Sequence, residues 1–391
     1  MAKYQKVKRN KNIYSSRRRC PTWLRILLFL VIMVAVGFFG GKLLLDAWND
    51  AKRNYQSSTL ESSSSNGSQE ISSSSQESVD SEPESSQAPE TNNRVNGVMM
   101  PQDILLDSTR QPAYFQQLKQ QGQTAVIVNL KDDHGTIYYQ SENLMANTYD
   151  AIVENAVDLS VLCQDIIDAG LTPIARIHTL KDAVVSRVAE DTTYLYYGQS
   201  GTAWLDNAKN AGGKTWLNPY KQNTKSYIAH LTAEITSAGF KRVILASLEY
   251  PGKDSAVMGI ANESLSRLEA LATLYTQVKS EAERNQATVA IEMSAEVFFG
   301  VNDVNYNGNP ALIGADELAV IFDANILKQN ETIPVLQNNL TGDFAGAIRV
   351  MKQDLEVDGT KVIPVFLSTQ AEQYNSYLQQ ASGDLDYYVI D

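Results

Sequence analysis

The stretch TAVIVNL, residues 124–130, is apolar and largely β-branched, and the polar run KDDHG follows it at residues 131–135. A strand that is apolar at successive positions is buried on both faces, as in parallel sheets that are covered by helices. The polar run marks the point where this strand ends in a loop. The stretch therefore predicts a parallel α/β fold.

Seven further stretches of the same kind follow or precede it. They lie at 97–100, 172–177, 242–247, 288–294, 318–322, 361–367 and 387–390. Amphipathic segments between them predict helices at 113–121, 158–169, 221–238, 263–284, 344–350 and 371–381. This alternation over residues 96–391 predicts a (β/α)8 TIM-like barrel. A doubly wound open sheet is the alternative, but no glycine-rich phosphate turn follows the first strand.

The N-terminal part of the chain predicts a membrane anchor. Residues 1–25 carry nine Lys or Arg and no acidic residue, and residues 26–45 are apolar apart from Lys42. Such a run is long enough to cross the ~30 Å core of a bilayer as a helix. The basic flank predicts a cytoplasmic N-terminus and an extracellular C-terminal domain. A cleaved signal peptide is the alternative, although no small-residue cleavage pattern follows the apolar run.

Residues 46–95 predict a disordered stalk between the membrane and the barrel. The stretch 57–91 consists mainly of Ser, Glu, Gln and Pro and has no aromatic residue, so it cannot bury enough apolar surface to fold. Cys163 is the only cysteine after residue 25, so no disulfide can form within the predicted domain. We expect a single-pass protein of a bacterial cell membrane.

The charge of the chain is divided unevenly. Nine of the 33 basic residues and none of the 45 acidic residues precede residue 26, which leaves a net charge of −21 on residues 26–391. Such an acidic surface argues against nucleic acid as a partner and is compatible with a neutral glycan or a cationic partner. His134 and His178 lack a third ligand at metal spacing, so we expect neither a metal site nor a cofactor.

The candidate site residues lie at the carboxyl ends of the predicted strands and in the loops after them, where barrels of this type carry their active sites. The candidate catalytic acids are Asp132, Glu249, Glu292 and Asp323. The candidate substrate-binding residues are Asn129, Lys131, Arg176, His178, Trp204, Trp216, Asn218, Tyr220 and Tyr250. Among these, Trp204, Trp216 and Tyr220 are expected to offer flat faces on which sugar rings stack.

Each candidate acid also has a structural interpretation. These are a turn or an ion pair for Asp132, solvation for Glu249, a pair with Arg176 for Glu292, and a cap for Asp323. The aromatic residues would equally suit a hydrophobic core. The sequence leaves both interpretations open.

Several stretches together resemble the bacterial putative glycoside hydrolase domain family, which is similar to the amylase-like clan of barrels. The resemblance is carried by VIVNLKDDHG at 126–135, IARI at 174–177, KD at 181–182, WLNPY at 216–220, AGF at 238–240, the segment 243–251 and MSAEVF at 293–298. It covers roughly residues 97–300. It implies a barrel that acts on glycans.

Three positions depart from what the resemblance implies, because Asn129, Asn218 and Ala246 stand where the family has Asp. Glycoside hydrolysis needs two carboxyl groups at the bond, and an amide cannot transfer the proton. The sequence thus favours a domain with a degenerate site that binds cell-wall or extracellular glycan. The alternatives are an active hydrolase with relocated carboxylates and a scaffolding protein that contacts other envelope proteins.

Overall fold

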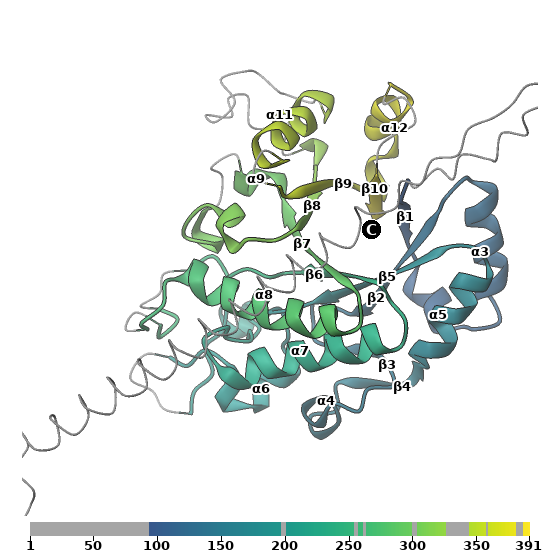
Figure 1. Cartoon of the computed structure of the whole chain (residues 1–391). Coiled ribbons are helices and arrows are strands. Elements are labelled where there is room, and N and C mark those ends of the chain that lie inside the picture. Colours follow the sequence, from purple (N-terminus) through teal and green to yellow (C-terminus); the bar gives the residue numbers. More distant parts are fainter. Residues whose placement is uncertain are drawn as a thin grey trace, which may run out of the picture. The chain divides into compact units, whose positions relative to one another are not determined.

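Eight parallel strands close into a ring in the computed structural model (Figure 1). In order around the ring they are β1 (Asn96–Met99), β2 (Ala125–Lys131), β5 (Thr172–His178), β6 (Arg242–Ala246), β7 (Thr288–Ser294), β8 (Glu317–Ile321), β9 (Lys361–Leu367) and β10 (Tyr387–Ile390). The ring closes because β1 pairs in parallel with both β10 and β2. The predicted (β/α)8 barrel is confirmed, and each predicted strand end lies within one residue of the observed one.

The structure describes residues 94–196, 201–253, 257–260, 263–298, 303–325, 344–356, 359–380 and 386–391. The predicted tail at 1–25, the predicted transmembrane helix at 26–45 and nearly all of the predicted stalk at 46–95 lie outside these residues. Among the residues described, none of the helices combines the length and the apolar character that a membrane span requires.

Helices surround the ring of strands (Figure 1). They are α2 (Gln102–Leu105), α3 (Gln111–Gln120), α4 (Leu144–Thr148), α5 (Leu159–Asp168), α6 (Val185–Val188), α7 (Gln222–Ser237), α8 (Arg267–Arg284), α9 (Ala295–Phe298), α11 (Phe344–Glu356) and α12 (Ala371–Gln380). The six predicted helices correspond to α3, α5, α7, α8, α11 and α12. Helix α5 illustrates the cause, because Asp158 caps its N-terminus and its buried residues recur at helical spacing.

Two short strands outside the ring were not predicted. Strand β3 (Ile137–Tyr139) pairs antiparallel with β2, and β4 (Ile152–Val157) pairs in parallel with β3. Three residues are too few to show a period. In β4, Glu154 and Asn155 are both exposed, so its sequence does not alternate between apolar and polar residues.

Two apolar clusters form the core of the barrel domain. The inner cluster fills the ring with alternate residues of its strands, including Ile127, Ile174, Ile244 and Ile363. The outer cluster lies between the strands and the helices, and it includes Cys163, which is buried and free as predicted. Because both faces of each strand are covered, the strand sequences are apolar at successive positions.

Candidate functional site

A buried ion pair lies inside the barrel near the carboxyl ends of the strands. From β5, Arg176 donates through Nε to Oε2 of Glu292 at 2.7 Å and through Nη2 to Oε1 at 2.6 Å. Each residue is 7% exposed, and this two-pronged geometry is the strong form of an Arg–carboxylate pair. Arg176 Nη1 also donates to Oδ1 of Asn129 at 3.1 Å. Both oxygens of Glu292 are therefore engaged by Arg176.

His178 connects this ion pair to the rim of the barrel. Its Nε2 lies 2.9 Å from Nη1 of Arg176, and its Nδ1 lies 2.8 Å from Oγ of Ser247. A guanidinium group can only donate, so Nε2 accepts and the proton is on Nδ1, which donates to Ser247. Burial, together with the charges of Arg176, Lys131 and Lys181, lowers the pKa of His178 to about 2. His178 is therefore neutral at physiological pH, with its proton on Nδ1.

Ser247 is a candidate site residue that the sequence analysis did not include. It follows the last residue of β6 and has a φ of 54°, which is uncommon for a residue other than glycine and occurs often at functional sites. The side chain is partly exposed. Because its oxygen accepts from His178, its own hydroxyl proton remains to donate to a ligand. Its place directly after a strand end was the available signal.

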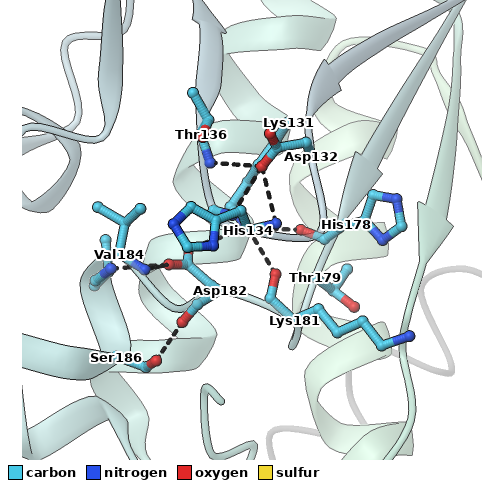
Figure 2. A network of polar contacts seen from close by, with 12 residues as sticks. Lys131, Asp132, His134, Thr136, His178, Thr179, Lys181, Asp182, Val184 and Ser186 are labelled. Atoms are coloured by element: carbon cyan, nitrogen blue, oxygen red, sulfur yellow. Dashed lines mark hydrogen bonds and ion pairs between the residues drawn. The ribbon is translucent and has the colours of Figure 1, made fainter. Parts of the chain in front are cut away.

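A second buried ion pair holds together the loops after β2 and β5 (Figure 2). Lys131 Nζ lies 3.0 Å from Oδ2 of Asp182, and both side chains are fully buried. The same ammonium donates to the carbonyls of His178 at 2.9 Å and Lys181 at 3.4 Å. The prediction that Lys131 contacts substrate is not supported, because its charge is directed at the backbone of the neighbouring loop.

Asp132 forms the turn that follows β2. Its Oδ1 accepts from the backbone N–H groups of residues 134–136 (Figure 2). Its Oδ2 accepts from the hydroxyl of Tyr138 at 2.7 Å. Gly135 in this turn has a φ of +106°, and a Cβ there would lie 2.2 Å from Oδ1 of Asp182. Both oxygens of Asp132 are therefore engaged within its own turn, which agrees with its structural interpretation.

Two of the aromatic side chains that were predicted to contact substrate are buried. Trp204 is 2% exposed and packs edge-on against Tyr194, with ring centroids 6.1 Å apart. Tyr250 is fully buried, and its hydroxyl donates to the carbonyl of Arg267 at 3.1 Å. Neither side chain is accessible in this structure, which argues against sugar stacking on Trp204 and substrate contact at Tyr250.

Asn218 and Tyr220 shape the start of α7. Asn218 is 3% exposed, and its Oδ1 accepts from the backbone N–H of Tyr220 at 3.0 Å. The predicted substrate contact of Asn218 is thus replaced by a turn within the chain. Tyr220 is half-buried, and its hydroxyl donates to the carbonyl of Leu265 at 3.0 Å.

Glu249 and Trp216 line one cavity of about 520 Å³ beside the rim of the barrel. Oε1 of Glu249 lies 3.5 Å from Nζ of Lys181, and its Oε2 accepts from Nδ2 of Asn305 at 3.1 Å. The indole N–H of Trp216 donates to Oδ2 of Asp206 at 2.9 Å. The structure thus brings together one predicted acid and one predicted aromatic residue in a space large enough for a small ligand.

Two further acids lie at the ends of β7 and β8. Oδ1 of Asp323 accepts from the backbone N–H of Asn325 and from Nε2 of Gln370, each at 2.7 Å. On α9, Glu296 accepts from Oγ of Ser294 at 3.3 Å. Burial raises the pKa of Glu296, and the charge of Asp323 raises it further, against the lowering effect of the Ser294 hydroxyl. Glu296 was missed as a candidate although it lies in the MSAEVF segment.

Within the part of the chain that the structure describes, no group of three or more His, Cys, Asp or Glu side chains is arranged to hold a metal ion. The structure thus offers no candidate ligand set there, and the expectation of a site without metal stays a prediction.

A family model described as "Putative glycosyl hydrolase domain" matches residues 97–315, which is more than half of the chain. The matched segment begins in β1 and includes Arg176, His178, Glu249 and Glu292. The chain belongs to this putative glycosyl hydrolase domain family. The resemblance that was drawn from the sequence motifs is confirmed.

Several solved structures are similar to this member of the putative glycosyl hydrolase domain family, and the one with a TM-score above 0.5 supports the barrel fold. The PgaB (BpsB) glycoside hydrolase domain from Bordetella bronchiseptica is 13% identical, with a TM-score of 0.52 over 76% of this chain and 93% of that domain. A hypothetical protein from Ruminiclostridium thermocellum is 17% identical, with a TM-score of 0.43 over 50% of this chain and 96% of that protein. No curated protein matches the chain.

Proposed function

We propose that the barrel binds a glycan at its carboxyl-terminal face and does not hydrolyse it. Membership in a glycosyl hydrolase domain family supports the class of ligand. The proposed lack of hydrolysis rests on the contacts that the predicted catalytic acids make within the protein. Three of the four have their carboxylates engaged by the protein, namely Glu292 by Arg176, Asp132 by its own turn, and Asp323 by Gln370.

Hydrolysis of a glycosidic bond needs two carboxyl groups on opposite sides of the bond, one of which donates a proton. A carboxylate that holds a guanidinium group through both oxygens has no free position for a substrate. Asn129 and Ala246 lie near the carboxyl ends of β2 and β6. Neither side chain can replace the engaged carboxylate of Glu292. Of the four predicted acids, Glu249 alone lines the cavity, and one acid does not complete the pair.

A second candidate function, hydrolysis by relocated carboxylates, is favoured by one observation. The pKa of Glu296 is raised, mainly by burial, and Asp323 is close enough for its charge to contribute. A carboxyl group with a raised pKa beside an ionised one is the arrangement that glycoside hydrolases use for their acid and their second carboxylate. In this reading Glu296 would donate the proton and Asp323 would act from the other side.

One experiment separates the two candidates. The full-length chain is incubated with oligosaccharides from wall polysaccharides, and both binding heat and newly formed reducing ends are measured. We expect binding without new reducing ends. Turnover that is lost in Glu296→Gln or Glu249→Gln, and retained in Glu154→Gln on the exposed part of β4, would contradict the proposal and identify the acid.

We further propose that residues 26–45 anchor the chain in the cell membrane and that residues 46–95 hold the barrel away from it. The apolar run and the basic residues before it support this proposal.

Absence of binding to any wall glycan would favour the alternative of a scaffolding protein that contacts other proteins of the envelope.

A further inference from the structure

Lys181 lines the cavity beside the barrel rim. Its Nζ lies 5.4 Å from the centroid of the Trp216 ring and 3.5 Å from Oε1 of Glu249. An aromatic face and a carboxylate are the two groups that proteins combine to recognise an ammonium ion. The side chain is 34% exposed and points away from the buried network around Lys131 (Figure 2).

The ring and the carboxylate are held in place by other residues. The Trp216 indole donates to Asp206 at 2.9 Å, and Glu249 accepts from Asn305 at 3.1 Å. The backbones of Lys181 and Trp216 also pair in an antiparallel bridge. Trp216 and Glu249 would therefore keep their positions if the side chain of Lys181 moved away.

The lysine itself is held weakly. A partly exposed ion pair with an N–O distance of 3.5 Å contributes little, and the four-carbon stem of lysine is flexible. Its removal from the ring would expose a preformed aromatic face beside a carboxylate. Lys181 thus resembles a ligand cation that the chain supplies to its own site.

We propose that the cavity of Lys181, Trp216 and Glu249 binds the primary ammonium group of an amino sugar and that Lys181 vacates this position when the glycan binds. This inference rests on the proposed glycan binding and specifies the class of sugar. Asp133 and Asp206 also line the cavity, whose volume of about 520 Å³ is within the usual range for ligand sites. The net charge of −21 on residues 26–391 favours the approach of a cationic glycan.

Substitution of Lys181 separates this inference from the simpler one, in which the lysine itself binds the sugar. The two inferences predict opposite changes in ligand affinity. If the lysine competes with the ligand, Lys181→Met raises the affinity, because the site no longer has an internal occupant. If the lysine instead binds a neutral or anionic sugar, the same substitution lowers the affinity. Lys214 lines the same cavity, so Lys214→Met removes an equal charge as a matched control.

The test measures binding of the full-length chain to a glucosamine oligomer and to its fully N-acetylated counterpart of the same length, by calorimetry at constant ionic strength. We expect the free amine form to bind more tightly. Lys181→Met should raise its affinity by about two- to fivefold, as expected from the loss of a weak ion pair, and by more than Lys214→Met does. Glu249→Gln should weaken binding of the amine form by more than it weakens binding of the N-acetylated form.

Equal affinity for both forms would overturn the amino-sugar site while leaving the proposed glycan binding intact. Absence of binding to either form would overturn both. Weaker binding of the amine form by Lys181→Met would overturn the displacement of the lysine. Equal gains in Lys181→Met and Lys214→Met would do the same, because they would reflect net charge alone.

Discussion

At the scale of single residues, two buried ion pairs lie near the carboxyl ends of the strands. Arg176 pairs with Glu292, and Lys131 pairs with Asp182. Removing a charged group from water is costly unless a partner and hydrogen bonds replace the water. The Arg176–Glu292 pair therefore links β5 to β7, and the Lys131–Asp182 pair links the end of β2 to the loop after β5.

The turn at Gly135 provides a direct test of this packing. We expect Gly135→Ala to lower the free energy of unfolding by at least about 2 kcal/mol, since alanine is disfavoured at a φ of +106° and its Cβ would clash with Asp182. Gly122→Ala is the matched control, because φ there is +76° and nothing lies within 4 Å of the added Cβ. Urea denaturation measures both. Equal losses would contradict the close approach to Asp182.

His178 should make the stability of the barrel depend on pH. Its pKa is lowered to about 2 in the folded state, from about 6.5 in an unfolded chain. Between these values only the unfolded chain binds the proton, so the free energy of unfolding falls as the pH decreases from 6.5 toward 2. The slope approaches about 1.4 kcal/mol per pH unit for this one group.

The variant His178→Asn retains a side-chain donor near the position of Nδ1 and cannot take up the proton. We expect it to lose this part of the pH dependence between pH 6.5 and 4, as measured by urea denaturation across that interval. Parallel curves for the two proteins would show that His178 is not the responsible group.

At the level of elements, helix starts depend on individual caps. The pattern of apolar residues predicted a helix from residue 263, whereas α8 begins at Arg267. The hydroxyl of Ser266 accepts from the backbone N–H of Glu269, and the carboxylate of Glu269 accepts from the backbone N–H of Ser266. This reciprocal pair is a capping box. The cap satisfies N–H groups that would otherwise lack partners, so the helix starts there.

We expect Ser266→Ala to lower the free energy of unfolding by about 1 kcal/mol, because it removes half of this box. Ser280→Ala, at an exposed position inside the same helix, should change it by no more than a few tenths of a kcal/mol. Thermal or urea unfolding of the two variants is the measurement. A loss at Ser280 as large as that at Ser266 would show that the cap is not the cause.

At the level of the whole molecule, the first and last described strands meet. β1 pairs with β10, and the C-terminus lies beside β1 (Figure 1). The ring is therefore closed by the first and last strands of the barrel domain, and β1 starts directly after the predicted stalk. Such a domain can be attached through its N-terminal end without interrupting the ring.

The proposed anchor predicts the result of proteolysis. Protease added to intact spheroplasts should remove the barrel and leave a small basic fragment that retains residues 1–45, because only the part beyond the membrane is accessible. Immunodetection of both ends provides the measurement, and permeabilised cells, in which the N-terminal tail is also cut, provide the control. Protection of the barrel in intact spheroplasts would contradict the proposed orientation.

The order of strands and helices was determined by the sequence alone, because burial on both faces makes strands such as 124–130 apolar at successive positions and because helical spacing is a local pattern. The roles of the polar residues were decided only by the tertiary structure. The sequence left the pairing of Glu292 with Arg176 open beside a catalytic role, and the structure shows that these residues, 116 positions apart, meet inside the ring. It likewise decided that Trp204 is buried. Pairing and burial of this kind depend on which distant segments become neighbours, and no local pattern of residues encodes that.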